Sequence, residues 1–164
     1  CAPQEGVDLG GDGGDSEFIA AIGGEPDQFD PQSTSSYFSF QVLENVFDTL
    51  VEPGDDLTMQ PALAESWEVS DDQLTWTFTL REGVTFHDGT EFTSEDVLYS
   101  YNRIIDEGLA NAWRFSAITG ISAPDDSTVV IEVAAPTPNL LANLGAFKGM
   151  AIVNEENVAS GEIQ

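Results

Sequence analysis

The segment from residue 61 to residue 103 carries the clearest alternation of apolar and polar side chains in the chain. Four apolar residues there alternate with Thr75, Thr77 and Thr79, namely Leu74, Trp76, Phe78 and Leu80. Because successive side chains of a strand point to opposite faces of a sheet, this spacing predicts a half-buried strand. Trp67 to Val69 is predicted to pair with it across the turn formers at 70–73.

A turn and a helix are predicted directly after this strand. Asp88-Gly89 supplies the turn between Val84–Phe86 and Glu91-Phe92, since glycine and aspartate tolerate the positive φ angles that such a turn needs. Thr93 is the predicted N-cap of a helix, and Asp96 three residues later makes a variant of the capping box. The acidic first turn also suits the helix dipole.

Weaker patterns predict the remaining elements. Helical spacing of apolar residues predicts a helix over 38–50 that ends before Pro53-Gly54, and the apolar run 18–22 predicts a first strand. Residues 128–133 read as a strand, 139–147 as a short helix, and 110–117 are ambiguous. Trp67, Trp76 and Phe78 are expected in the core. Together, these strands and helices predict the α/β class, with a small mixed sheet flanked by helices.

The order of motifs resembles a known family. The run begins at Pro61, continues through Leu63-Ala64 and Trp67 to the strand at 74–81, and reaches the Gly83 to Gly89 turn and the helix over Ser94–Arg103. In that order these motifs resemble the signature region of the extracytoplasmic solute-binding proteins of peptide and nickel ABC importers, which include the oligopeptide- and dipeptide-binding proteins. The resemblance covers most of residues 17–153.

The resemblance implies a fold and a function. It implies part of lobe I of a type II periplasmic-binding-protein-like fold over 17–164, with a second lobe absent. The Gly/Asp/Glu-rich composition of residues 1–16 predicts a flexible tether before it. The resemblance also implies a binding protein, not an enzyme, that captures oligopeptides or dipeptides outside the membrane and delivers them to ABC permease subunits. An oligosaccharide or a nickel complex is the alternative ligand for the same fold. The alternative functions are an acidic surface hydrolase and an adhesive surface domain.

The candidate ligand-binding residues lie in the polar loop 32–40 and near the ambiguous segment. Loops on a rigid scaffold often carry binding groups. The resemblance implies that Ser35, Ser36 and Tyr37 line the cleft, and it places Trp113 where a family aromatic residue packs against ligand. The alternatives are a plain surface loop for the first three residues and a core position for Trp113.

Cys1 is the only cysteine, so the chain has no internal disulfide. Its position resembles the lipidated cysteine that remains after signal-peptide removal in bacterial lipoproteins, which implies a periplasmic or cell-surface protein anchored to the membrane. The alternative is a truncation boundary. No run of 18 or more apolar residues occurs in the sequence.

Thirty acidic and four basic residues give a net charge of −26. Repulsion on this scale favours a salt-adapted, halophilic host, because salt screens it. Nucleic-acid binding is excluded for want of a basic patch. His87 is the only histidine and reads as a turn residue, and the pairs Asp55-Asp56, Asp71-Asp72 and Asp125-Asp126 read as solvated turns. We therefore expect no cofactor, no metal site and no catalytic residue.

Overall fold

The computed structural model describes residues 19–161 and 163. The predicted tether and the predicted lipid anchor Cys1 lie outside these residues. In chain order the elements are α1 (Tyr37–Leu43), β1 (Val51–Pro53), β2 (Met59–Pro61), β3 (Ala64–Val69), β4 (Thr75–Leu80), α2 (Ser94–Asp106), the 3-10 helix η1 (Ala112–Phe115), β5 (Ile118–Asp125), β6 (Thr128–Val133), α3 (Leu140–Gly145), the 3-10 helix η2 (Lys148–Met150) and α4 (Glu155–Ala159). None of the helices described is long and apolar enough to span a bilayer.

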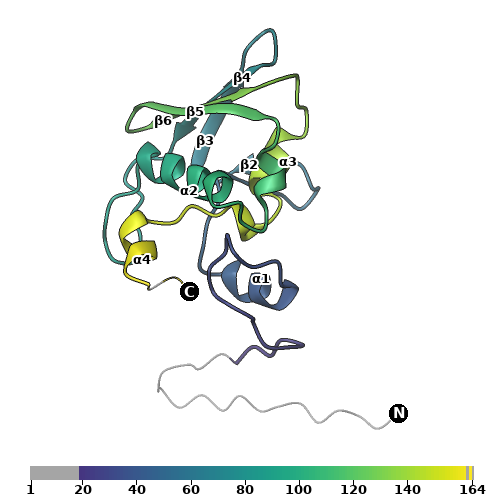
Figure 1. Cartoon of the computed structure of the whole chain (residues 1–164), viewed down its shortest axis with the longest axis vertical. Coiled ribbons are helices and arrows are strands. Elements are labelled where there is room, and N and C mark those ends of the chain that lie inside the picture. The colour runs from purple at the N-terminus through teal and green to yellow at the C-terminus, as the bar shows by residue number, and fades with distance from the viewer. Residues whose placement is uncertain (1–18, 162, 164) are drawn as a thin grey trace.

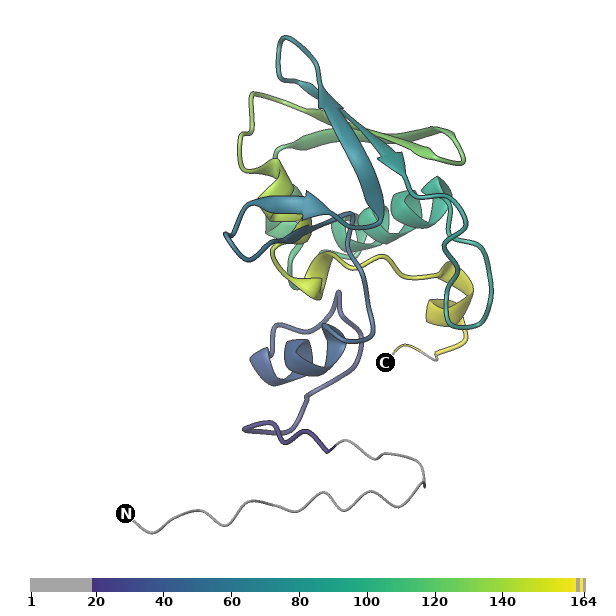
Figure 2. The same cartoon turned by 180° about the vertical axis from the view of Figure 1, so that it is seen from behind.

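The main sheet has the strand order β3-β4-β6-β5, and β1 and β2 form a separate hairpin that packs beside α3 (Figure 2). The predicted pairing of β3 with β4 is confirmed, with Trp67 opposite Phe78 and with Gln73 in the turn at a φ of 59°. The α/β class is confirmed as well. Every strand pair in the described part of the chain is antiparallel, where a mixed sheet was expected.

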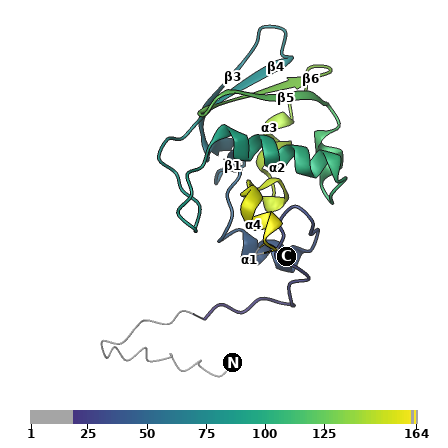
Figure 3. The ribbon, with the colours of Figure 1, turned by 60° about the vertical axis from the view of Figure 1, so that its left-hand side comes forward.

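The core lies between one face of the main sheet and α2, which crosses beneath it (Figures 1 and 3). Alternate residues of β4 and β6 point to this face and are buried: Trp76, Phe78, Leu80, Val129, Ile131 and Val133. Val97, Tyr101 and Ile104 of α2 are fully buried against them. Each such side chain contributes about 1.5–3 kcal/mol. The period-two pattern therefore fixes the position of α2 on the sheet.

The start of α2 follows the predicted capping chemistry. The backbone N–H of Thr93 donates to the Asp96 carboxylate at 2.9 Å, and Asp96 and Thr93 form the predicted capping box. The turn before it is also confirmed, with Gly89 at a φ of 87° and the Phe86 N–H donating to the Thr90 carbonyl at 2.8 Å. Local sequence signals thus set where α2 begins.

Two predicted elements are wrong in extent. The helix expected over 38–50 ends at Leu43, because the carbonyls of Thr49 and Leu50 accept hydrogen bonds from residues 62–64 and draw the chain into the hairpin. Residues 19–22 form no strand within the described chain. Ile19 is 80 % exposed, and a strand without a neighbouring strand leaves its backbone groups unpaired. The ambiguous segment 110–117 contains η1.

A buried polar network fastens the loop before α1 to α2. The Arg103 guanidinium donates to both oxygens of Asp30, at 2.6 and 3.3 Å, and to the Gln32 amide oxygen at 2.8 Å. The side chains of Arg103 and Asp30 are 9 % and 7 % exposed. Gln32 donates in turn to the backbone carbonyls of Ser100 and Ala151. The network therefore joins three segments that are far apart in the sequence.

The Asp30 carboxylate is held ionised by this network. Burial alone would raise the pKa of Asp30, but hydrogen bonds from Arg103, Ser33 and the Gln32 N–H outweigh burial and lower the pKa below its usual value. A carboxyl whose folded-state pKa is lowered stabilises the fold fully above its unfolded pKa of about 3.9 and loses that contribution as the pH falls through the folded-state pKa. The pair should therefore weaken only in acid.

We predict that Asp30→Asn lowers the free energy of unfolding by about 3 kcal/mol at neutral pH, because it removes the buried partner of Arg103 and leaves only the exposed Glu107 carboxylate, 3.8 Å from Arg103 Nε. Urea unfolding measures the change. The difference from the unmodified protein should shrink once the pH falls below about 4. Asp55→Asn, which removes an equal charge from an exposed turn, is the control and should leave the free energy of unfolding unchanged. Equal stability of Asp30→Asn and Asp55→Asn would contradict the prediction.

Candidate ligand-binding surface

The loop before α1 is folded back on itself by one carboxylate. Asp27 accepts hydrogen bonds from the hydroxyls of Ser39 at 2.6 Å and Thr34 at 2.7 Å. Both bonds lower the pKa of Asp27, and the bond from Ser39 has the larger effect. Together with the Asp30 network they fix both ends of the segment that leads into α1. The backbone of this segment is therefore held by side chains of nearby residues in the sequence and by α2.

The predicted site residues of this loop lie at its outer surface. Ser35 is exposed, and Ser36 is the N-cap of α1, with its N–H donating to the Thr34 hydroxyl at 3.0 Å. Tyr37 is the first residue of α1 and is 71 % exposed. The three side chains are therefore accessible, as a binding role requires. Their role in binding stays a prediction.

Trp113 lies in η1 and is 65 % exposed, so the alternative of a core tryptophan is wrong. The guanidinium carbon of Arg114 lies 4.5 Å from the centre of the Trp113 ring and 4.9 Å from that of Phe147. Phe147 in turn lies 6.4 Å, centre to centre, from Phe40 of α1. We call these four residues, Phe40, Trp113, Arg114 and Phe147, the aromatic–arginine cluster. It joins α1, η1 and the N-cap of η2 into one surface.

The close approach that forms this surface depends on Gly149. A Cβ atom at Gly149 would lie 2.2 Å from the Asn111 side-chain nitrogen and 3.5 Å from the Phe40 ring. A side chain at residue 149 would therefore force the Asn111 side chain to move where η2 passes it. The Asn143 amide fixes η1 from the other side by donating to the Arg114 carbonyl at 3.2 Å.

Several polar atoms at this surface lack partners. Of the six buried side-chain atoms without a hydrogen-bond partner among residues 19–161 and 163, three belong to this region: Gln41 Oε1, Asn111 Nδ2 and Arg114 Nε. Gln41 belongs to the same turn of α1 as Phe40, and its amide nitrogen is 3.5 Å from the Tyr37 hydroxyl. Buried polar atoms are normally paired. The packing of this region therefore leaves these three buried atoms unpaired among the described residues.

The predicted site residues are only partly brought together. Among the described residues, no hydrogen bond or ring contact joins Tyr37 or the two serines to Trp113. Their connection runs along α1 to Phe40 and then through Phe147 to Arg114. Sequence reasoning missed Phe40, Arg114 and Phe147. The signal for Arg114 was present, since it is one of four basic residues and directly follows Trp113.

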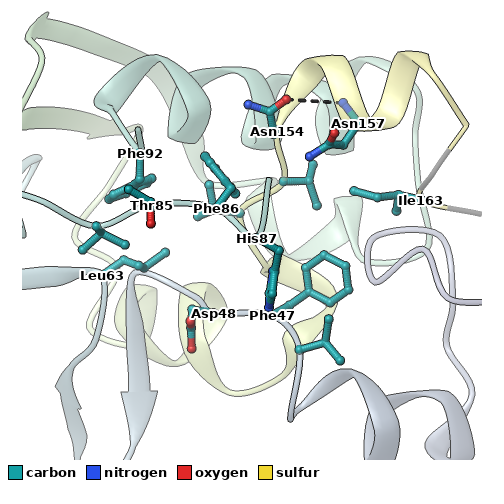
Figure 4. Close-up of a pocket in the computed structure, with 14 residues that line it drawn as sticks. Phe47, Asp48, Leu63, Thr85, Phe86, His87, Phe92, Asn154, Asn157 and Ile163 are labelled. Atoms are coloured by element: carbon teal, nitrogen blue, oxygen red, sulfur yellow. Dashed lines mark hydrogen bonds between the residues drawn. The ribbon is translucent and has the colours of Figure 1, made fainter. Parts of the chain in front are cut away.

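A concavity of about 230 Å³ lies elsewhere, between the chain after α1, the Val84 to His87 turn and α4 (Figure 4). Most of its lining is apolar: Val46, Phe47, Leu63, Val84, Phe86, Phe92, Ile152, Val153 and Ile163. Its polar side chains are Asp48, Thr85, His87, Asn154 and Asn157. The last two are already engaged, because Asn154 Oδ1 accepts from two N–H groups of α4 and the Asn157 amide donates to Asp88. This pocket is therefore a weaker candidate for recognising a polar ligand.

The remaining acidic residues and His87 behave as turn residues. Asp56, Asp72, Asp88 and Asp125 each accept a backbone N–H from a residue two positions on. The exposed His87 lies in the turn that contains Asp88. Within residues 19–161 and 163, no group of three or more His, Cys, Asp or Glu side chains is placed to hold a metal ion.

Comparison with known proteins gives a consistent result. The family model of the bacterial extracellular solute-binding proteins, family 5 middle region, matches residues 58–162. The periplasmic murein peptide-binding protein MppA of Escherichia coli is 31 % identical over 89 % of this chain and 30 % of its own length.

Two solved structures are similar in fold. The periplasmic binding protein AgaA of A. tumefaciens, in complex with agropinic acid, has a TM-score of 0.78 and 34 % identity over 85 % of this chain and 28 % of its own. Haemophilus influenzae OppA, in complex with RPPGFSPFR, has a TM-score of 0.78 and 25 % identity over 84 % of this chain and 30 % of its own. The chain thus spans less than a third of the length of these relatives.

We predict that Gly149→Ala destabilises the protein by about 1–3 kcal/mol and displaces the aromatic–arginine cluster, because the added methyl group collides with Asn111. Urea unfolding measures the first effect, and the near-ultraviolet circular dichroism of the aromatic residues measures the second. Gly23→Ala is the matched control, because its methyl group would meet only the Phe38 ring, at 3.4 Å. Equal effects of the two substitutions would contradict the importance of Gly149.

Proposed function

We propose, because this chain belongs to the bacterial extracellular solute-binding proteins of family 5, that it forms one wall of a site that captures oligopeptides or dipeptides for an ABC importer. The observation that carries the proposal is the aromatic–arginine cluster, in which Trp113 is 65 % and Phe147 is 48 % exposed. Large exposed aromatic side chains held in place by their neighbours are typical of binding surfaces. The names of MppA and OppA point to peptides.

The geometry suits a ligand with a polar backbone and varied side chains. The exposed rings offer apolar contact, while the exposed Ser35 and the partly exposed Ser36 offer hydroxyl groups at the start of α1. Recognition through backbone hydrogen bonds tolerates different side chains. In our proposal the ligand lies between this surface and a second lobe of a longer polypeptide, the lobes close over it, and the closed form docks on the permease subunits.

The family is one of solute-binding receptors and not of enzymes. We place the protein outside the cytoplasmic membrane, as the names of its periplasmic relatives support. The lipid on Cys1 and the preceding signal peptide remain predictions, and mass spectrometry of the protein purified from its own membranes tests the first of them. Adaptation to a salt-rich host also remains a proposal, supported by the net charge of −26.

Peptide binding by the full-length protein tests the proposed function. We predict saturable binding of defined peptides of two to about five residues, measured by titration calorimetry. Trp113→Ala should weaken this binding about tenfold, because it removes an exposed ring from the proposed contact surface. Leu57→Ala, which truncates an apolar side chain that is 83 % exposed in the β1–β2 turn, should leave the affinity unchanged. Failure to bind any peptide would overturn the proposed function.

Salt dependence of stability tests the proposed adaptation. We predict that the melting temperature rises as sodium chloride increases from about 0.1 M to about 1 M, because the Debye length falls from about 10 Å to about 3 Å and screens the mutual repulsion of the acidic residues. Sucrose at matched osmolarity is the control for effects that do not depend on charge. A melting temperature that is the same in dilute buffer and in molar salt would disprove the salt adaptation.

A further inference from the structure

Arg114 differs from the other basic residues of this acidic chain in its surroundings. Arg103 is paired with Asp30, and Lys148 lies 3.9 Å from Asp48. Arg81 is exposed and donates to the Ala62 carbonyl. Arg114 lies within 4 Å of no carboxylate oxygen in residues 19–161 and 163, and its guanidinium makes no hydrogen bond to any of them. In a chain with thirty acidic residues, this cation thus has no carboxylate partner among the described residues.

The guanidinium is nevertheless held in place. Its carbon lies 4.5 Å from the centre of the Trp113 ring and 4.9 Å from that of Phe147, so that two aromatic side chains contact it. The backbone of Arg114 is fixed in η1, where its carbonyl accepts from the Asn143 amide. The rings attract the cation but do not replace a hydrogen-bond acceptor. A guanidinium has five N–H donors, and the buried Nε is one that lacks a partner here.

We propose that Arg114 binds a carboxylate group of the ligand, so that this surface selects ligands that carry a negative charge next to an apolar group. The inference rests on the proposed function and names the class of solute. A planar, fixed guanidinium matches a carboxylate through two parallel hydrogen bonds. Trp113 and Phe147 would contact the apolar part of the same ligand. The carboxylate is either the C-terminus of a peptide or an acidic side chain.

The test compares charged and neutral forms of one ligand on the full-length protein. The probe is the most tightly bound of the defined peptides used to test the proposed function, made as the free acid and as the C-terminal amide, together with Glu-to-Gln and Asp-to-Asn exchanges at its acidic side chains. The unmodified protein should prefer one charged form by about tenfold or more, as measured by titration calorimetry. The amide pair and the side-chain pairs then distinguish the two sources of the carboxylate.

Variants of Arg114 test its part in this preference. Arg114→Gln should bind the charged and neutral forms equally, within about twofold, whereas Arg114→Lys should keep part of the preference because it retains a charge without the planar fork. Arg81→Gln, which removes an equal charge beyond the end of β4, should keep the full preference. Circular dichroism confirms that each variant is folded, and Arg114→Lys keeps the test decisive if Arg114→Gln does not fold.

The contrary outcomes are distinct. If the unmodified protein binds the charged and neutral forms equally, this inference is overturned while the proposed function stands. If Arg114→Gln loses stability but keeps the preference, Arg114 belongs to an ion pair within the longer polypeptide and the inference is again overturned. If no peptide binds in any form, the proposed function fails and this inference fails with it.

Discussion

The buried ion pair between Asp30 and Arg103 is the contact on which the arrangement of the ligand surface depends. Taking two charges out of water is unfavourable, and such a pair stabilises a fold only when its geometry and its extra hydrogen bonds are good. Here both Asp30 oxygens accept from the guanidinium, and Gln32 accepts a further N–H. The pair therefore does more than add stability, because it permits one position of the loop on α2.

This constraint reaches the candidate site through α2. Alternate residues of β4 and β6 hold α2 on the sheet, and Arg103 and Ser100 on α2 hold the chain segments below it. The Ser100 hydroxyl accepts from the N–H of Val153 and donates to its carbonyl, three residues after η2 ends, while Arg103 holds the loop before α1. The two segments that carry Phe40 and Phe147 are thus positioned by one helix.

Features encoded within a few residues could be predicted from the sequence, and features that depend on distant segments could not. The Asp88-Gly89 turn and the Thr93 cap are local, and both are confirmed. The end of α1 was missed, because it depends on pairing of residues 49–50 with residues 62–64. Trp113 was named from the family resemblance, but Phe147, which contacts the same Arg114 guanidinium, is separated from it in the sequence by β5, β6 and α3.

The negative net charge of the chain and the positive charge of Arg114 act on an anionic ligand in opposite directions. A net charge of −26 repels an anionic solute at long range, whereas Arg114 would attract its carboxylate at short range. Salt screens exposed charges separated by more than a Debye length and screens partly buried contacts much less. Raising the salt therefore removes more of the repulsion than of the attraction. If both proposals hold, a salt-rich medium would stabilise this fold and also favour the capture of acidic ligands.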